Sequence, residues 1–356
     1  MRNVKSKAPT GVVRRPARRV QARLPCLNDS FLERGIRNNE ARANTMNKGE
    51  FKNLISKENI AVPATDGFRL AATLFRAPHE DAPLVIIAAA TAVKRGYYEK
   101  FARFLAQNDF QSLTFDYRGI GDSRPASLKG FKAEMHEWGE LDLAGVINWA
   151  TEILAPPQIL YVGHSVAGQI LPLAYNNHRV SAAYLVASQS GYWKLWRGKR
   201  RLMVFTLWHL SIPIATTLFG YFPGWLLGNA EHLPVGVARE WALWGRHPDY
   251  ILNHSHDTRK RFSAVQVPLK FVSFSDDALI APKTAVETIA SWYGSAHKEH
   301  LHLQPKQIGA KTIGHFGFFR ESFQDTLWRD AASWLKDQAF ANTKDRSAAY
   351  VGMHAL

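Results

Sequence analysis

Cysteine is almost absent from this 356-residue sequence. Cys26 is the only one, so an internal disulfide cannot form and a disulfide-stapled secreted scaffold is excluded. A reducing, cytoplasmic location is therefore favoured. Internal repeats of the length that builds solenoids are also lacking. Charged residues make up 21% and hydrophobic residues 46% of the chain, a balance typical of a globular protein and not of a disordered one.

The first 45 residues lack apolar periodicity, and Phe31 is their only aromatic residue. They carry eleven Lys or Arg against three Asp or Glu, and so supply +8 of the formal charge of +15. We predict a disordered basic tail at 1–45 and a second tail at 341–356. No apolar run follows the basic start, which excludes a secretory signal and leaves a transit peptide or an over-long start before Met46. Because the charge is concentrated in the tail, we expect no nucleic-acid partner.

From residue 46 onward, strand and helix patterns alternate. Short apolar runs such as Leu84–Ala89 are typical of strands buried on both faces, and Tyr97–Asn108 has apolar residues at helical spacing. The sequence predicts strands at 53–62, 69–76, 84–89, 111–117, 158–162, 182–187, 268–274 and 298–303, and helices at 97–108, 137–154, 165–175, 284–292 and 325–338. The alternation predicts an α/β core at 46–190 and 257–340, with a mainly parallel central sheet flanked by helices.

Charged residues are absent from Leu202–Ala230, a run of 29 residues within the interval 191–256. The run is long enough to span a membrane, but a single span would place the two parts of the predicted sheet on opposite sides. We therefore predict that residues 191–256 form an inserted, apolar helical cap. Three roles of the cap helices are consistent with this pattern: they pack on the sheet, they line a hydrophobic acyl pocket, or they dock on a membrane through Trp196 and the basic run Arg197–Arg201. The last two roles are compatible.

The stretch Gly163-His164-Ser165-Val166-Ala167 joins a predicted strand to a predicted helix. A serine on such a sharp turn is exposed for nucleophilic attack, and small residues two before and two after it let the backbones approach. Ser165 is therefore the candidate nucleophile, while a capping serine in a glycine-rich turn is the plainer interpretation. An alcohol is a poor nucleophile at neutral pH, so it needs a base, and the base needs an orienting carboxylate.

Two later loops contain residues of these types. Asp276 and Asp277 follow the strand predicted at 268–274, and His315 follows the last predicted strand in the stretch Gly-His-Phe-Gly. The carboxyl ends of strands in an α/β sheet gather at one edge, where sites form. Either aspartate could orient His315, and both could instead stabilise a turn.

Several stretches resemble serine hydrolases of the α/β-hydrolase fold: LVIIAAAT, FDYRGIGDS, GHSVAG, SFSDDALIAP and GHFGFF. The similarity covers nearly all of residues 50–340 and is greatest to bacterial predicted α/β hydrolases whose substrates are not assigned. It implies that Ser165 is the nucleophile and His315 the general base and acid. It also favours Asp277 over Asp276 as the orienting acid, although Pro282 lies one residue further from Asp277 than in the family pattern.

The oxyanion of an acyl-transfer intermediate needs backbone N–H donors. Val166 offers one, at the N-terminus of the helix after Ser165. The second should come from the loop after the strand at 84–89. Many relatives have His-Gly in this loop, whereas this chain has no glycine there. Thr91 and Ala92 are the two alternatives.

Other motifs are interpreted as structural. The FDYRGIGDS turn lacks the spacing of a phosphate-binding loop. Two close pairs of histidines, His254 with His256 and His300 with His302, have no Asp, Glu or Cys at a diagnostic spacing. We therefore expect no metal site and no cofactor.

Together these features predict a serine hydrolase that cleaves an ester or related acyl bond of a small hydrophobic molecule through an acyl-enzyme. An acyltransferase, in which an alcohol or thiol replaces water, is an alternative on the same scaffold. A non-catalytic binding protein is a third, and the presence of Ser165, His315 and an aspartate argues against it. The predicted location is cytoplasmic, with membrane association if the cap docks on a bilayer.

Overall fold

The computed structural model describes residues 55–228 and 230–339. The tails predicted at 1–45 and 341–356 lie outside these residues. The described chain contains an eight-stranded sheet in the order β1-β2-β4-β3-β5-β6-β9-β10. The first two strands pair antiparallel, β2 pairs antiparallel with β4, and the other pairs are parallel. The predicted mainly parallel sheet is confirmed.

The strand positions follow from the apolar pattern. The strands are β1 (Ser56–Pro63), β2 (Arg69–Arg76), β3 (Leu84–Ala88), β4 (Gln111–Phe115), β5 (Ile159–His164), β6 (Val180–Val186), β9 (Leu269–Phe274) and β10 (Lys298–Leu303). Every residue of β3, β4, β5 and β9 is buried, as expected for short continuous apolar runs covered on both faces. The edge strand β10 has no buried residue.

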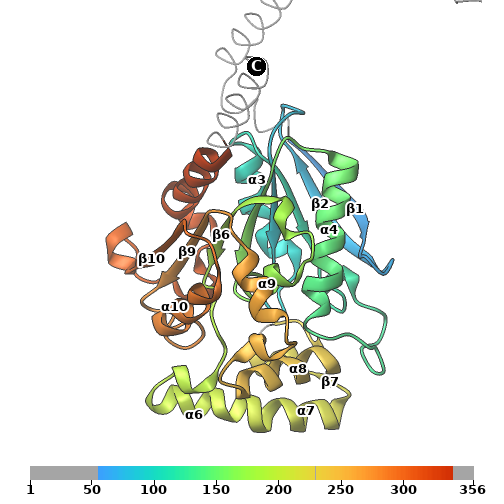
Figure 1. The fold of residues 1–356 in the computed structure, drawn as a ribbon, viewed down its shortest axis with the longest axis vertical. Coiled ribbons are helices and arrows are strands. Elements are labelled where there is room, and N and C mark those ends of the chain that lie inside the picture. The colour runs from blue at the N-terminus through green and yellow to red at the C-terminus, as the bar shows by residue number, and fades with distance from the viewer. Residues whose placement is uncertain (1–54, 229, 340–356) are drawn as a thin grey trace, which may run out of the picture. The chain divides into compact units, whose positions relative to one another are not determined.

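Helices cover both faces of the sheet (Figure 1). They are α3 (Glu99–Ala106), α4 (Ala144–Trp149), α5 (Ala167–Ile170), α9 (Thr258–Ala264), α10 (Lys283–Trp292), α11 (Gly314–Gly317) and a last helix over residues 329–339. α3 packs against the segment that leads into the last helix, where the rings of Phe101 and Trp328 lie 5.4 Å apart. α9 contacts α10 and the turn after α5. These two groups are the flanking layers that the alternating pattern predicts.

The helix predicted at 165–175 is an exception. Only α5 (Ala167–Ile170) is α-helical, and a tight turn over Leu171–Leu173 follows it. Pro172 lacks an N–H and its ring clashes with the preceding helical turn, so it ends the helix early.

The interval between β6 and α9 forms the cap, which lies below the sheet in the view of Figure 1. It contains α6 (Gly198–Thr206), α7 (Ile212–Phe219), α8 (Val235–Arg246) and the two-stranded pair β7 (Tyr221–Phe222) and β8 (Leu233–Pro234), which the sequence did not predict. Residues Gly198–Phe219 make one continuous helix, and an 18-residue stretch of it has a mean hydropathy of 1.6, so the helix is long and apolar enough to cross a membrane by length and composition alone. However, β6 and β9, which flank the cap in sequence, pair directly, so both ends of the cap return to one sheet.

Candidate active site

Ser165 directly follows β5, at the sharp turn into α5. Its φ of 55° lies in the left-handed region, and its backbone N–H donates to the carbonyl of Val186 at 2.9 Å. The turn requires Gly163, because a Cβ there would stand 2.7 Å from the ring of Tyr161 and 3.3 Å from the methyl of Ala167. Ala167 therefore fits in place of the usual glycine because residue 163 has no side chain. The result is a serine held in a strained backbone at the carboxyl edge of the sheet.

His315, in the short helix α11, and Asp277, in the loop after β9, lie against each other although they are distant in the chain. Nδ1 of His315 donates to Oδ2 of Asp277 at 2.6 Å, and the two side chains are only 4% and 2% exposed. The other carboxylate oxygen of Asp277 accepts from the backbone N–H of Ala281 at 3.3 Å. The hydrogen bond between Nδ1 of His315 and Asp277 fixes the histidine tautomer and leaves Nε2 as the nitrogen that can accept a proton.

Asp276 contacts the same loop in a different way. Its Oδ2 accepts hydrogen bonds from the hydroxyl of Thr312 at 2.8 Å and from the backbone N–H groups of Ile313 and Gly314 at 2.8 and 3.1 Å. Burial alone would raise the pKa of Asp276, but these hydrogen bonds hold it below its ordinary value. Asp276 therefore anchors the backbone before His315, whereas Asp277 touches the imidazole.

Sequence reasoning missed a buried chain of hydrogen bonds that joins three loops of the site. The backbone N–H of Ala90 donates to the hydroxyl oxygen of Tyr98 at 2.8 Å. That hydroxyl lies 2.8 Å from Nδ1 of His164, whose Nε2 lies 3.0 Å from the carbonyl of His315. A carbonyl only accepts, so Nε2 carries the proton and Nδ1 accepts from Tyr98. Burial, with His315 nearby, holds the pKa of His164 well below its ordinary value, which keeps this ring neutral.

Gln189 is a second residue that sequence reasoning missed. Its Oε1 lies 3.5 Å from Oγ of Ser165, and its backbone carbonyl accepts from the side-chain amide of Gln169 at 2.8 Å. The carbonyl oxygen of that amide accepts in turn from the hydroxyl of Tyr250 at 2.9 Å. The only signal for Gln189 in the sequence is its place just after β6, the strand beside β5, because strand ends gather at the site.

The predicted oxyanion donors have open backbone N–H groups. Val166 is fully buried, Ala92 is 2% exposed, and Thr91 is half-buried. No described residue accepts a hydrogen bond from the N–H of Val166, Thr91 or Ala92. Ala92 adopts a φ of 60°, and its carbonyl accepts from the N–H of Glu231 in the cap at 2.9 Å. Buried backbone donors nearly always have partners, so open ones here suit a ligand oxygen.

The FDYRGIGDS turn has the structural contacts of a loop anchor. Arg118 is 4% exposed, and its guanidinium lies 2.7 Å from Asp142 and 3.0 Å from Asp66. The carboxylate of Asp116 accepts from the backbone N–H of Asp122 at 3.0 Å. These contacts use the charged side chains of the turn within the protein.

The structure holds one of the two histidine pairs together and separates the other. His300 and His302 both bond through one ring nitrogen to the hydroxyl of Ser273 on β9, at 2.8 and 2.7 Å. His256 is 92% exposed. His254 instead joins residues that are distant in sequence.

His254, His136 and Glu240 place their donor atoms within 4.8 Å of one another. Nδ1 of His136 and Nδ1 of His254 lie 2.9 and 3.2 Å from the same oxygen of Glu240, on α8. Two imidazoles and a carboxylate form a donor set that zinc can use. Here, however, the Nδ1 atoms of both histidines already have Glu240 as a partner. We interpret the set as an ion-pair cluster that ties the cap to the core.

The titration of this cluster follows from its geometry. Hydrogen bonds with Glu140 and Glu240 raise the pKa of His254 to about 9. Burial alone would raise the pKa of Glu240, but the hydrogen bonds from His136 and His254 lower it to about 2. The cluster therefore holds both charge signs at neutral pH.

The chain is similar to known proteins of one fold. A family model described as alpha/beta hydrolase fold matches residues 82–236. No curated protein matches the sequence. Similar solved structures include Est1E from Butyrivibrio proteoclasticus with bound ferulic acid, at 13% identity and a TM-score of 0.53 over 79% of this chain and 99% of that one. The esterase EaEST from Exiguobacterium antarcticum is 15% identical, with a TM-score of 0.53 over 78% and 100%.

A soluble variant of monoglyceride lipase from Saccharomyces cerevisiae, in complex with a substrate analog, is also similar. It is 16% identical, with a TM-score of 0.55 over 80% of this chain and 94% of that chain. At such identities the likeness is one of fold, and it agrees with the sheet order and with the strand-turn-helix around Ser165. The chain is therefore a protein of the α/β-hydrolase fold, as its sequence motifs predict.

Proposed function

We propose that this protein is an esterase- or lipase-like serine hydrolase that cleaves an ester or related acyl bond through a Ser165-His315-Asp277 triad. One observation carries the proposal: the buried 2.6 Å hydrogen bond between His315 and Asp277, two residues that follow strands of the same sheet as the Ser165 turn. A hydrogen-bonded, buried Asp-His pair at the same sheet edge as a serine in a strained turn suits nucleophilic catalysis better than binding alone.

The proposed reaction starts with attack by Oγ of Ser165 on the carbonyl carbon of the substrate. Nε2 of His315 takes the serine proton, and Asp277 stabilises the imidazolium through Nδ1–H. The N–H of Val166, with that of Thr91 or Ala92, binds the oxyanion of the tetrahedral intermediate. His315 then protonates the leaving alcohol, and an acyl-enzyme remains on Ser165.

The second half of the reaction repeats these roles with water. His315 deprotonates the water as it attacks the acyl carbon, and the serine oxygen leaves with the returned proton. In the resting site, Oγ of Ser165 lies 3.5 Å from Oε1 of Gln189. Because that contact is long, attack can begin without breaking a strong hydrogen bond.

The apolar cap supports a substrate with a hydrophobic acyl group. It also supports contact with a membrane, from which such a substrate would come. We propose that the protein itself is cytoplasmic. A series of p-nitrophenyl esters of increasing chain length tests the substrate class. We expect kcat/KM to rise with chain length, because each buried methylene adds about 0.8 kcal/mol of transfer free energy. A preference for acetate over longer chains would contradict the hydrophobic-substrate proposal.

Labelling with a fluorophosphonate probe tests the nucleophile. The probe phosphonylates a serine only when a base activates it, so wild-type protein should be labelled and Ser165→Ala should not. Ser190→Ala is a matched control, because Ser190 is also buried, in the loop that contains Gln189, and this variant should label like wild type. A wild type that resists the probe, or a Ser165→Ala protein that is still labelled, would overturn the proposal.

A further inference from the structure

The continuous helix Gly198–Phe219 has two apolar faces. Val204, Trp208, Ile212 and Ala215 recur at helical spacing and are buried toward the rest of the cap. Met203, Leu210, Ile214 and Leu218 recur at the same spacing on the opposite side, where they are 56%, 50%, 54% and 72% exposed. An ordinary surface helix has a polar outer face, so this helix lacks the usual solvent side.

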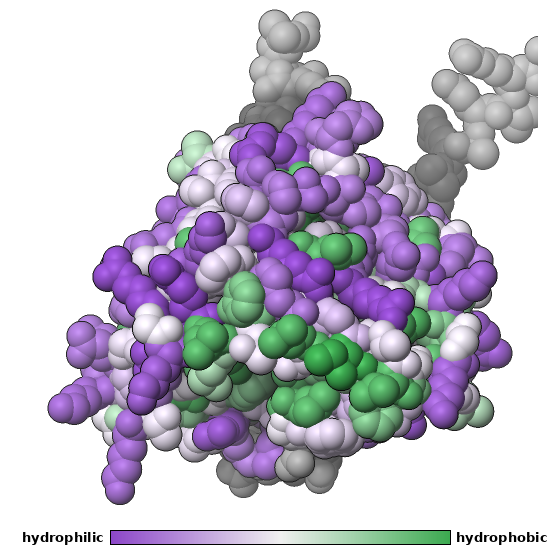
Figure 2. Space-filling view, turned by 90° about the horizontal axis from the view of Figure 1, so that it is seen from below, coloured by the Kyte–Doolittle hydropathy of each residue, from purple (hydrophilic) through white to green (hydrophobic). Residues whose placement is uncertain are grey.

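The outer apolar face extends beyond this helix. Trp225 and Leu226 follow it in the chain, and Leu243 on α8 is 59% exposed. Figure 2 shows hydrophobic residues gathered across the cap side of the molecule, and α6 and α7 lie end to end along the lower edge of the cap in Figure 1. A gathered apolar surface on a folded protein indicates a partner.

The charges around this surface indicate what the partner is. The helix begins in a basic run, and Asp and Glu are absent from the sequence between Gly198 and Ala230. No described carboxylate lies within ion-pair distance of Lys199, Arg200 or Arg201. An apolar helix face next to cations without ion-pair partners, in a stretch of sequence without acids, is complementary to an anionic lipid surface.

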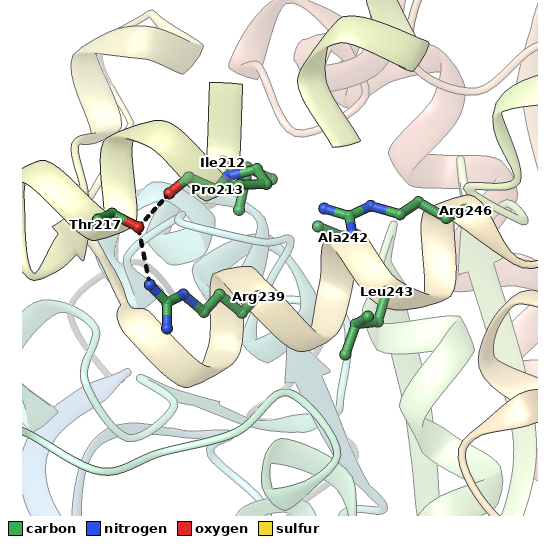
Figure 3. Close-up of a pocket in the computed structure, with 7 residues that line it drawn as sticks. All are labelled: Ile212, Pro213, Thr217, Arg239, Ala242, Leu243 and Arg246. Atoms are coloured by element: carbon green, nitrogen blue, oxygen red, sulfur yellow. Dashed lines mark hydrogen bonds between the residues drawn. The ribbon is translucent and has the colours of Figure 1, made fainter. Parts of the chain in front are cut away.

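A groove between α7 and α8 adds a specific feature (Figure 3). Its volume is about 240 Å³, and Ile212, Pro213, Ala242 and Leu243 give it apolar walls. Arg239 and Arg246 lie seven residues apart on α8, so they occupy the same helix face with Leu243 between them. Two cations therefore stand at an open apolar groove.

Both arginines are held in place without a counter-charge. Arg239 donates to the hydroxyls of Thr216 and Thr217 at 3.0 and 3.2 Å, and Arg246 donates through Nε to the carbonyl of Trp208 at 2.9 Å. In the part of the chain that the structure describes, neither guanidinium has a carboxylate within 4 Å. Each has five N–H donors, so donors remain for a phosphate oxygen.

We propose that the outer face of the cap docks on an anionic phospholipid bilayer, and that the groove between α7 and α8 receives the phosphate of one lipid between Arg239 and Arg246. The helix Gly198–Phe219 lies in the plane of the interface, with Leu210, Ile214 and Leu218 among the acyl chains. The inference deepens the proposed function by naming the surface, lipid charge and residues of the membrane contact. Its test does not require turnover.

Co-sedimentation of the full chain with vesicles tests the docking. Vesicles of phosphatidylcholine with one quarter phosphatidylglycerol should pellet the protein at low salt. Pure phosphatidylcholine vesicles should bind at least tenfold more weakly, and so should the mixed vesicles at high salt, because the attraction is screened. Failure to bind mixed vesicles at low salt would overturn the proposal. Ser165→Ala should bind like wild type, which separates docking from the hydrolase proposal.

Two sets of variants test the surface. Leu210→Glu with Leu218→Glu should lower the affinity for mixed vesicles at least tenfold, whereas Ile153→Glu should not. Ile153 is a matched control, because it is 66% exposed and lies on the helical segment Ala150–Leu154 of the core. Equal effects of the core and cap variants would refute the assigned face. If wild type is a dimer that the cap variant dissociates, and neither binds vesicles, the occupant is a second copy.

The groove has its own test. Arg239→Gln with Arg246→Gln should weaken binding to mixed vesicles about tenfold or more. The double lysine variant keeps the positive charges and a long side chain at both positions, and it should retain most of the binding. Inorganic phosphate at millimolar concentration should not displace the vesicles, because the apolar contacts remain. Displacement by phosphate would assign the groove to a free anion instead, and unchanged binding of the glutamine variants would remove the groove from the docking site.

Discussion

The carboxyl edge of the sheet and the outer face of the cap treat their side chains in opposite ways. At the sheet edge, buried polar groups are matched across loops: Asp277 with His315, and Tyr98 with His164. On the cap, nine of the fourteen large hydrophobic side chains that the described structure exposes lie between residues 191 and 256. Most polar side chains of the sheet edge therefore have a partner within the protein, whereas the cap leaves apolar surface and arginines open to an external partner.

This difference separates two kinds of inference. The polar contacts of the sheet edge restrict the chemistry, because each hydrogen bond fixes a proton or an orientation. The exposed surface of the cap restricts the environment in which that chemistry occurs. The ion-pair cluster of His136, His254 and Glu240 ties the cap to the core that carries the sheet edge, since Glu240 belongs to the cap helix α8.

The largest expected effect tests the sheet edge. Asp277→Asn should lower kcat/KM on a p-nitrophenyl ester about 10³- to 10⁴-fold, because the amide no longer stabilises the imidazolium of His315. Asp276→Asn should lower it less than tenfold, because Asp276 holds the loop through Thr312 and two backbone N–H groups. Assays of both variants at matched protein stability distinguish them. A larger loss for Asp276→Asn would reassign the acid.

A smaller effect on the same edge comes from Tyr98→Phe. The change leaves the N–H of Ala90 and Nδ1 of His164 without their buried partner, and an unsatisfied buried group costs about 1–3 kcal/mol. We expect the free energy of unfolding to fall by about 2 kcal/mol in urea denaturation. We also expect kcat to fall about tenfold, because Tyr98 no longer holds the ring of His164, which contacts the carbonyl of His315. Tyr175→Phe is the control: Tyr175 is 66% exposed and its hydroxyl only accepts a hydrogen bond from the side chain of Asn148, so removing that hydroxyl should cost clearly less. Equal costs would mean that the buried chain contributes nothing special.

Much of this candidate site could be proposed from the sequence, and the missing parts share one cause. Ser165 and His315 could be named as candidates because local glycines and their place after strands define the turns. The choice between Asp276 and Asp277 depended on which of the two adjacent side chains points at His315. The resemblance favours Asp277, but only the structure shows which carboxylate contacts the imidazole. Tyr98 and His164 are 66 residues apart, and no local pattern encodes such a pair.

The cap was harder to predict for a different reason. Its helix Gly198–Phe219 is apolar on both faces, so periodicity could not tell the buried face from the exposed one. The ion-pair cluster was missed because Glu240 lies 104 residues from His136. His254 was noticed in the sequence, but only beside His256, which points away into solvent.

The link between the two regions should respond to pH. Because the folded protein raises the pKa of His254 to about 9, its contribution to stability is full below about pH 6.5 and is lost as pH rises through 9. The lowered pKa of Glu240, about 2, acts in the other direction: its contribution is present above its ordinary pKa and is lost as pH falls toward 2. Stability from the cluster is therefore greatest between about pH 5 and 6.5.

Urea denaturation at pH 6 and pH 9 measures this link. We expect the loss at pH 9 to be about 1–2 kcal/mol, which is below the full value of the shift because the side chains are partly exposed to screening solvent. Glu240→Gln should be less stable at pH 6 and should lose less stability between the two values. The same pH slope in wild type and Glu240→Gln would show that other groups carry it.

The smallest expected effect lies on the outer face of the cap. Leu218→Ser should change the free energy of unfolding by less than about 0.5 kcal/mol without lipid, because Leu218 is 72% exposed and has little packing to lose. Ile212→Ala, on the inner face of the same helix and fully buried, should cost about 2–4 kcal/mol. Urea denaturation of the two variants side by side compares one helix with itself. A cost for Leu218→Ser close to that for Ile212→Ala would mean that the outer face is already packed in the free protein, and the contrast between sheet edge and cap would then disappear.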